Sequence, residues 1–470
     1  MTVTSKFASA AVAALLVSAV GAQTFAAEIT PLADETVETA KAIRDKALES
    51  DEAYEILASL TTEVGARLAA SPKEVEAQEW AVAKFQELGF DKVWKEPVMV
   101  PKWTRISESA SVVAPFAQPL VITALGKSVA TPEGGVTAEI AHFATYEDLE
   151  AAERSAVEGK IVFISNRMER FRTGAGYGPA VKARGAGASM AASKGALAIM
   201  IRSIGTDTHR LPHTGGVTYD EAQPKIAAVA LSNPDADQLV RMLGYGEAVS
   251  VHLDIQTTME EPVEMFNVIG EITGREKPEE AIILGSHLDS WDLGTGAIDD
   301  GAGVAITMAA ANLIQDFSET RPYRSIRVVA FAAEELGLIG ARQYAEAHKD
   351  KDMDKHIIGA ESDFGAGPVW ALASNVNPAS LHVVDKMATV MGPLGVVRSD
   401  RKAGGGPDVG QLARAGMPVM DLMQDGTDYF DLHHTADDTL DKVDPVALRQ
   451  NVAAWVSFAY IAAEWPGYFR

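Results

Sequence analysis

The 470-residue sequence contains no cysteine. This absence excludes disulfide bonds, thiol nucleophiles and thiolate metal sites, so any metal must be held by His, Asp or Glu. Basic residues are also scarce, because 41 Lys and Arg stand against 65 Asp and Glu and give a formal charge of −24. A surface of this sign repels phosphate backbones and anionic lipid. We therefore expect no nucleic acid and no membrane as a partner of the mature protein.

Long hydrophobic runs are confined to the N-terminus. Lys6 precedes an apolar, alanine-rich run over residues 7–20, and small residues continue to Ala27. A short basic region, an apolar region of this length and small residues near its end are typical of a secretory signal peptide. No later stretch approaches the roughly 18 uninterrupted apolar residues of a membrane span. We therefore assign residues 1–27 to a signal peptide and expect a soluble mature protein that is periplasmic or secreted.

The length and the changes of composition predict more than one structural unit, since domains average roughly 150 residues. Residues 28–117 are assigned to the N-terminal part of the main domain. In residues 118–255, short β-like runs are separated by glycine- and proline-rich turns, which indicates an inserted β-rich domain. In residues 256–470, strands alternate with helices, which predicts an α/β fold with a mostly parallel sheet flanked by helices.

Local patterns place individual elements. Ser71-Pro72 followed by Glu74 is typical of a helix start, and Gly89 is typical of a helix end. In the last part of the chain a helix is expected to begin near Glu334, directly after a strand. The remaining strands are expected over 93–100, 160–165, 196–201, 226–231, 281–285, 325–331, 357–361 and 418–423, and the remaining helices over 181–195, 303–314 and 445–463.

Polar residues follow these candidate strands in a regular order. Each piece alone has an ordinary explanation, because His-x-Asp occurs in surface loops, Glu-Glu begins solvated helices and Asp-Asp-Gly forms turns. Their coincidence at the carboxyl ends of strands, or in nearby loops, is what indicates a site, since chemistry in such sheets lies beyond those ends. The residues are His287, Asp289, Asp299, Glu334, Glu335, Asp363, His433 and His434.

This ordered set resembles the zinc peptidase family M28, and most closely its plasma glutamate carboxypeptidase branch, also called carboxypeptidase Q. The segment Gly-Ser-His-Leu-Asp-Ser-Trp-Asp over 285–292, Pro-His-Thr-Gly over 212–215 and the doubled His433-His434 support that branch. The resemblance covers nearly all of the mature chain. It implies a zinc exopeptidase fold in which residues 118–255 form a protease-associated-like insert.

The resemblance also implies two Zn²⁺ per chain. Asp299 would bridge the two ions. His287 and Asp363 would complete one site, and Glu335 and His434 would complete the other. Paired metals of this kind stabilise a nucleophilic hydroxide and polarise a carbonyl.

Three further residues receive catalytic roles from the resemblance. Glu334 would be the general base, and Asp289 would be the carboxylate that orients His287. His433 is a candidate donor to the tetrahedral oxyanion, and a loop histidine without a catalytic role is the alternative. Around the substrate, Asp408 is a candidate for the pocket wall. The insert residues His213 and Arg210 are weaker candidates, because ordinary surface positions are favoured for both.

The expected function is therefore that of an exported di-zinc exopeptidase acting on unsubstituted dipeptides or short peptides. Ordinary aminopeptidases of the family lack so large an insert and often have Tyr before the last ligand, where this chain has His433. A broad aminopeptidase on longer peptides is the first alternative. A one-zinc cyclising acyltransferase and a non-catalytic receptor are less favoured, because all five ligands and the base are present. The branch is similar to homodimeric enzymes, so a homodimer is one expected assembly.

Overall fold

The computed structural model describes residues 1–2, 30–317 and 320–470. The signal peptide expected over residues 1–27 lies outside the described residues apart from its first two. Of the described helices, the stretch Ala297–Phe317 is long and apolar enough to cross a membrane, but its apolar window is entirely buried. It is therefore a core helix of the fold.

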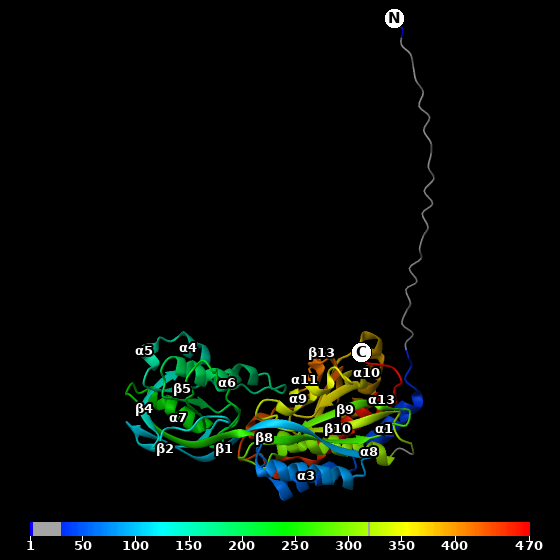
Figure 1. The fold of residues 1–470 in the computed structure, drawn as a ribbon, viewed down its shortest axis with the longest axis horizontal. Helices are drawn as coiled ribbons and strands as arrows, with labels where there is room; N and C mark the ends of the chain where they lie inside the picture. Colours follow the sequence, from blue (N-terminus) through cyan, green and yellow to red (C-terminus); the bar gives the residue numbers. More distant parts are fainter. Residues whose placement is uncertain (3–29, 318–319) are drawn as a thin grey trace.

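A mixed β-sheet runs through the molecule (Figure 1). At its centre β9 is parallel to β10 and to β11, and β11 is parallel to β14, which confirms the α/β fold expected from the alternation of strands and helices. Antiparallel neighbours flank this parallel core, with β8 beside β10 and β12 beside β14. The strands of this part, in spatial order, are β13 (Val397–Lys402), β12 (Val369–Asn375), β14 (Val419–Gln424), β11 (His356–Glu361), β9 (Lys277–His287), β10 (Arg324–Phe331) and β8 (Ser250–Ile272).

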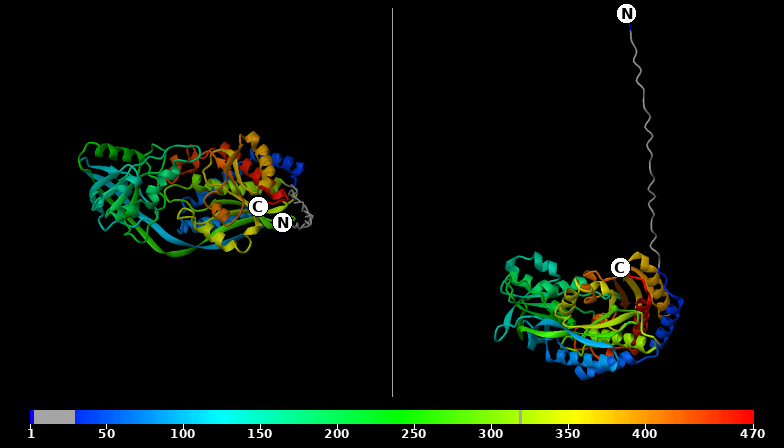
Figure 2. Two further views of the ribbon diagram at one scale, coloured as in Figure 1. Left: turned by 90° about the horizontal axis from the view of Figure 1, so that it is seen from above. Right: turned by 45° about the vertical axis from the view of Figure 1, so that its right-hand side comes forward.

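Two long strands join this part to the inserted segment. β1 (Lys92–Ala114) pairs with β8 in antiparallel register from Lys92 opposite Glu271 to Ala114 opposite Ser250. The expected strand over 93–100 is therefore the first part of a longer one. Figures 1 and 2 show this ribbon passing from the larger part of the molecule into the smaller, cyan and green part beside it.

The smaller part has its own strands and helices. Its strands continue the order of the sheet beyond β8, and its longest helix packs against β6. Its strands are β4 (Val136–Phe143), β5 (Ile161–Ile164), β6 (Ala198–Arg202), β7 (Ala227–Leu231) and β3 (Ile122–Ala124), with β2 (Gln118–Leu120) paired to β1, and its helices are α4 (Tyr146–Ala151), α5 (Arg154–Val157), α6 (Tyr177–Ser193) and α7 (Asn233–Leu243).

Helices cover both faces of the larger part of the sheet. Neighbouring residues of one strand point to opposite faces, so Ile282 and Leu284 belong to one buried core and Ile283 to another. Figure 1 shows the helices on these faces. The first core lies under α1 (Asp34–Ala47), α2 (Glu52–Ser59), α3 (Pro72–Glu87), α8 (Ala302–Phe317), α10 (Leu381–Met391) and α13 (Pro445–Glu464), and the second lies under α9 (Ile339–His348) and α11 (Val409–Arg414).

Two helix starts were expected from local sequence signals, one at Ser71-Pro72 and one near Glu334. The start of α3 is confirmed, because the Ser71 side chain accepts a hydrogen bond from the backbone N–H of Glu74. The helix expected near Glu334 is wrong, since α9 begins only at Ile339. The intervening residues form a loop in which Ala333 has a φ of 53° and Leu338 a φ of 59°. A left-handed backbone at both ends of this segment is incompatible with a continuous helix.

Candidate metal centre

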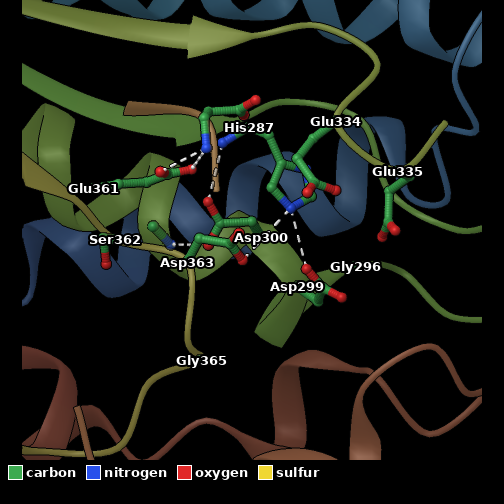
Figure 3. Close-up of polar contacts among 12 residues, drawn as sticks. His287, Gly296, Asp299, Asp300, Glu334, Glu335, Glu361, Ser362, Asp363 and Gly365 are labelled. Carbon is green, nitrogen blue, oxygen red and sulfur yellow. Dashed lines mark hydrogen bonds and ion pairs between the residues drawn. The ribbon is translucent and has the colours of Figure 1, made fainter. Parts of the chain in front are cut away.

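Three neighbouring parallel strands bring the site residues together. β9 ends at His287, β10 ends shortly before the Glu334-Glu335 pair, and β11 ends two residues before Asp363. Phe331 at the end of β10 lies opposite His287 in the register of the two strands. Because the carboxyl ends of parallel strands share one edge, these side chains meet there. Figure 3 shows them gathered around His287.

Loops supply the other two members of the cluster. Asp299 lies between β9 and α8, where the Asp438 carboxylate accepts hydrogen bonds from the backbone N–H groups of Ile298 and Asp299, at 2.6 and 3.2 Å. His434 follows α12 (Tyr429–Leu432) and has a φ of 62°. Asp299 and His434 are therefore positioned by the conformation of loops and not by the end of a strand.

The Asp299 carboxylate lies at the centre of the cluster. Its Oδ1 is 3.1 Å from His287 Nε2, and its Oδ2 is 3.2 Å from His434 Nε2. On the two outer sides, His287 Nε2 is 3.7 Å from Asp363 Oδ1 and His434 Nε2 is 3.0 Å from Glu335 Oε2. The structure thus brings together the five residues expected to bind metal, with Asp299 between the two histidines.

The chemistry of this cluster fits metal ions. Its nitrogen and carboxylate ligands are those that zinc accepts in the absence of thiolates. Among the described residues, Asp299 Oδ2 and Glu335 Oε1 are buried without a hydrogen-bond donor. Buried carboxylate oxygens without a partner are costly, and a cation between them would remove that cost. Three overlapping groups of His, Asp and Glu side chains have ligand atoms close enough to hold an ion.

Asp289 connects the histidine to the loop that carries the two glutamates. Its carboxylate accepts hydrogen bonds from the backbone N–H groups of Glu334 and Glu335, at 3.0 and 3.3 Å. Its Oδ1 is 3.5 Å from His287 Nδ1, and that nitrogen lies 3.0 Å from the backbone carbonyl of Asp289 itself. With Nδ1 facing these acceptors, Nε2 is left to face the cluster.

Glu334 belongs to the wall of the cavity in front of the cluster. Burial raises the pKa of Glu334 well above the ordinary value of a glutamate, and the nearby carboxylates of Glu335 and Asp363 raise it further, against the opposing effect of His287. Glu334 and Glu335 are therefore neighbours with different surroundings, because only Glu335 contacts His434.

His433 stacks on His434, with ring centroids 3.5 Å apart and an angle of 19° between the planes. Its Nε2 is 3.7 Å from Asp299 Oδ2, and its Nδ1 is buried without a hydrogen-bond partner among the described residues. Burial and the neighbouring charge of His434 lower the pKa of His433 well below its usual range. A neutral imidazole at this position carries one N–H donor.

The inserted segment fixes the backbone of this histidine pair. His213 Nδ1 lies 2.7 Å from the carbonyl oxygen of His433, and His213 Nε2 lies 2.6 Å from Asp207 Oδ2. The carbonyl of Thr214 lies 3.2 Å from His434 Nδ1, so that His434 presents Nε2 to the cluster. The inserted segment therefore contacts the His433-His434 pair through His213 and Thr214.

A cavity of about 500 Å³ opens in front of the cluster. His213 and Arg210 are not among its lining residues, because both nitrogens of His213 are engaged elsewhere and Arg210 pairs with Asp235 at 2.8 Å. The favoured surface position is confirmed for Arg210, which is exposed, and is wrong for His213, which is buried. Asp408 is fully buried and is not among its lining residues. The wall consists of Thr173, Tyr177, Asp299, Glu334, Glu361, Asp363, Phe364, Arg401, Gly404, Gly406, Pro407, Asp421, Leu422, Met423, Gln424, Tyr429, Phe430 and His433.

Two supporting residues were not expected from the sequence. Arg67 is fully buried and donates hydrogen bonds to the backbone carbonyls of Leu288, Thr295 and Gly296, which belong to the loops around the cluster. Asp300 accepts from the backbone N–H of His287 at 3.0 Å. The Asp-Asp-Gly turn is a visible signal for Asp300, whereas nothing in the sequence around Arg67 indicates its distant partners.

Comparisons with known proteins agree with this geometry. The model of peptidase family M28 matches residues 267–459. Carboxypeptidase Q of Mus musculus is 34% identical over 411 residues, which covers 87% of this chain and 85% of that protein. The crystal structure of a peptidase M28 precursor from Shewanella amazonensis SB2B is similar with a TM-score of 0.91 and 49% identity, over 93% of this chain and 98% of that one.

More distant structures share the fold. A zinc aminopeptidase from Bacillus subtilis superposes with a TM-score of 0.65 at 18% identity, over 89% of this chain and 98% of that one. The arrangement of a large sheet flanked by helices is thus common to both chains.

Proposed function

Because the chain belongs to peptidase family M28 and is a metallo-exopeptidase, we propose that it hydrolyses unsubstituted dipeptides or short peptides at a centre of two zinc ions. In this proposal Asp299 would be a ligand of both ions, His287 and Asp363 would be further ligands of one, and Glu335 and His434 would be further ligands of the other. The observation that carries the proposal is the position of Asp299, whose two oxygens face the two histidines at 3.1 and 3.2 Å.

The bound ions would activate a water molecule and polarise the scissile carbonyl. The chain itself supplies the proton transfers. Glu334 would accept the proton of the attacking water and pass it to the leaving amine. Its position at the cavity and its raised pKa support this role, because a base works best when its pKa is near the working pH.

Two neighbours would assist the base. Asp289 would hold Glu334 in place through the backbone N–H of that residue, and would fix the orientation of His287. His433 would donate a hydrogen bond to the oxyanion that develops on the substrate carbonyl. The lowered pKa of His433 supports a neutral imidazole, which keeps one N–H donor and adds no positive charge beside the metal ions.

The size and surroundings of the cavity support small substrates. Its volume of about 500 Å³ is in the ordinary range for pockets that enclose small molecules. Thr173 and Tyr177 of the inserted segment form part of its wall and so limit the space for a longer chain. Residues 118–255 are proposed as an inserted domain of a periplasmic or secreted enzyme, for which a homodimer is one of the assemblies to test.

A panel of matched substrates tests this proposal. Zinc-loaded wild type, Glu334→Gln and Glu133→Gln would be compared on a free dipeptide, its N-acetyl form, its C-terminal amide and a pentapeptide. We expect the wild type to prefer the free dipeptide and Glu334→Gln to lose all hydrolysis. Glu133 is exposed and is not among the residues of the cavity wall, so its substitution controls for the loss of one carboxylate.

Other outcomes would contradict the proposal in different ways. Equal cleavage of the amide and the pentapeptide would identify a broad aminopeptidase instead. Full activity of Glu334→Gln would contradict the assignment of Glu334 as the general base. Absence of zinc-dependent cleavage of every substrate would contradict peptide hydrolysis at this centre.

A further inference from the structure

The cavity wall contains a single cationic side chain, that of Arg401. This residue lies at the exposed end of β13, and within the described part of the chain its guanidinium has no hydrogen-bond or ion-pair partner. The carboxylic acids and the histidine of the wall are Asp299, Glu334, Glu361, Asp363, Asp421 and His433. Arg401 is thus a residue of the cavity wall whose guanidinium has no partner in the described part of the chain, and the other charged residues of that wall are mostly acidic.

Asp421, another residue of the wall, forms no ion pair with Arg401. Asp421 accepts hydrogen bonds from the backbone N–H groups of Gly404 and Gly405, at 3.1 and 2.7 Å, and its carboxylate is used to hold this glycine loop. The guanidinium of Arg401 therefore remains available for a ligand.

The glycine loop connects Arg401 to the metal end of the cavity. Gly406 has a φ of 92°, and a Cβ there would lie only 2.3 Å from Glu361 Oε2. Only glycine allows the backbone to pass this close to the carboxylate. The stretch 401–406 thus carries the guanidinium of Arg401 at its start and contacts the Glu361 carboxylate at its end.

We propose that Arg401 binds the free α-carboxylate of the substrate and selects peptides whose C-terminus is unblocked. The planar guanidinium can bind a carboxylate through two parallel hydrogen bonds, which a C-terminal amide cannot reproduce. Away from the metal ions, the net charge of −24 disfavours an anionic group, and the guanidinium of Arg401 would offset that effect. This inference rests on the proposed function and specifies how that site recognises short substrates.

The inference also gives a reason for a limit on length. A dipeptide spans about 7 Å when extended. When the scissile bond of a dipeptide lies at the metal end, its carboxylate lies one residue from that bond. Each residue added at the C-terminus moves the carboxylate more than about 3 Å farther from the bond. The carboxylate of a pentapeptide cleaved at its first bond would lie roughly 10 Å farther from the metal end than that of a dipeptide.

Kinetics with charge variants test the inference. We would measure kcat/KM of wild type, Arg401→Gln, Arg401→Glu and Lys402→Gln for a free dipeptide and its C-terminal amide. Arg401→Gln should lower kcat/KM for the free dipeptide roughly 10- to 100-fold, mainly through KM, because one charge-assisted contact is lost. The amide should be much less affected, and Arg401→Glu should prefer the amide.

Lys402→Gln is the matched control. Lys402 is the exposed neighbour on the same strand, and its side chain is not part of the cavity wall. The substitution Lys402→Gln removes one positive charge and leaves the cavity wall unchanged. The ratio of kcat/KM for the dipeptide to kcat/KM for the amide should therefore stay at the wild-type value. Equal losses for both substrates in Arg401→Gln, or no loss for either, would overturn the inference.

A binding measurement separates this inference from the catalytic proposal. In the zinc-loaded Glu334→Gln background, the free dipeptide is expected to bind with a Kd roughly 10- to 100-fold lower than in Glu334→Gln/Arg401→Gln. Equal Kd values would overturn the inference even if the wild type is a dipeptidase. Conversely, unequal Kd values together with full activity of Glu334→Gln would support the role of Arg401 in substrate binding. The same result would contradict the role of Glu334 as general base.

Discussion

The side chain of His213 contacts the backbone carbonyl of His433, with 2.7 Å between Nδ1 and the oxygen. The two residues belong to segments that are 220 positions apart, and Asp207 holds the other side of the His213 ring at 2.6 Å. The inserted segment therefore sets the position of a residue in the wall of the cavity.

Substitution of His213 should weaken catalysis through this contact. We expect His213→Ala to lower kcat/KM for a free dipeptide roughly 10-fold, because the carbonyl of His433 loses its donor. His213→Asn keeps a donor near the position of Nδ1 and should recover part of the loss. Arg210→Ala in the same segment serves as control. Unchanged activity of His213→Ala would show that the contact has no role in the reaction.

Asp289 should control metal affinity. In Asp289→Asn, one oxygen becomes an amide N–H₂ and faces the backbone N–H of Glu334 or Glu335, so the loop and the orientation of His287 both lose support. We expect zinc affinity to fall 10- to 100-fold, the usual effect of losing such a partner. Competition with a chromophoric chelator would measure it, with Asp350→Asn, an exposed position, as control. Wild-type affinity would contradict this role.

Arg67 should contribute to stability and to the site together. Arg67→Met would leave the buried carbonyls of Leu288, Thr295 and Gly296 without their donors. We expect the free energy of unfolding to fall by about 3 kcal/mol or more, since each unsatisfied buried acceptor costs roughly 1 to 3 kcal/mol. Urea denaturation would measure the change, and Arg342→Met on the exposed side of α9 should have little effect. A similar midpoint for both variants would refute the prediction.

His356 should make stability dependent on pH. Its Nε2 lies 2.9 Å from the Tyr344 hydroxyl and its Nδ1 lies 3.0 Å from the carbonyl oxygen of Asp352, as in a neutral ring. Burial, together with the charge of Arg327, lowers the pKa of His356 from 6.5 to about 4. Below pH 6.5 the unfolded chain binds a proton that the folded chain does not, so the stability from this group is present above pH 6.5 and is lost as pH falls toward 4.

Between pH 7 and pH 5 this linkage amounts to about 2 kcal/mol. The metal-free protein would be unfolded in urea at both pH values, for wild type and for His356→Gln, which cannot titrate. The metal ligands titrate in both proteins, so their contribution cancels in the difference. We expect His356→Gln to lose less stability than the wild type on acidification. Equal losses would show that His356 does not titrate as described.

The metal cluster could be predicted from the sequence because its signals are local. His287, the Glu334-Glu335 pair and Asp363 each follow an apolar run, and adjacent parallel strands bring such positions to one edge. The resemblance to family M28 then supplied the order of the ligands, and the family membership is confirmed. The roles of the individual residues stay predictions until metal binding and catalysis are measured.

Features that depend on distant parts of the chain could not be predicted. The strand β13 has mostly polar and exposed residues, so it lacks an alternating pattern, and the long pairing of β1 with β8 follows from tertiary register. The helix expected near Glu334 failed because Ala333 and Leu338 have a left-handed backbone, which the local sequence does not indicate. Arg67 and His213 act on carbonyls more than 200 positions away.

The central claim is that Asp299 bridges two zinc ions. Diffraction data from crystals of the zinc-loaded protein, collected above and below the zinc absorption edge, test it directly. We predict two anomalous peaks roughly 3.5 to 4 Å apart, with one oxygen of Asp299 at each. A single peak, or two peaks that do not share Asp299, would contradict the proposed centre.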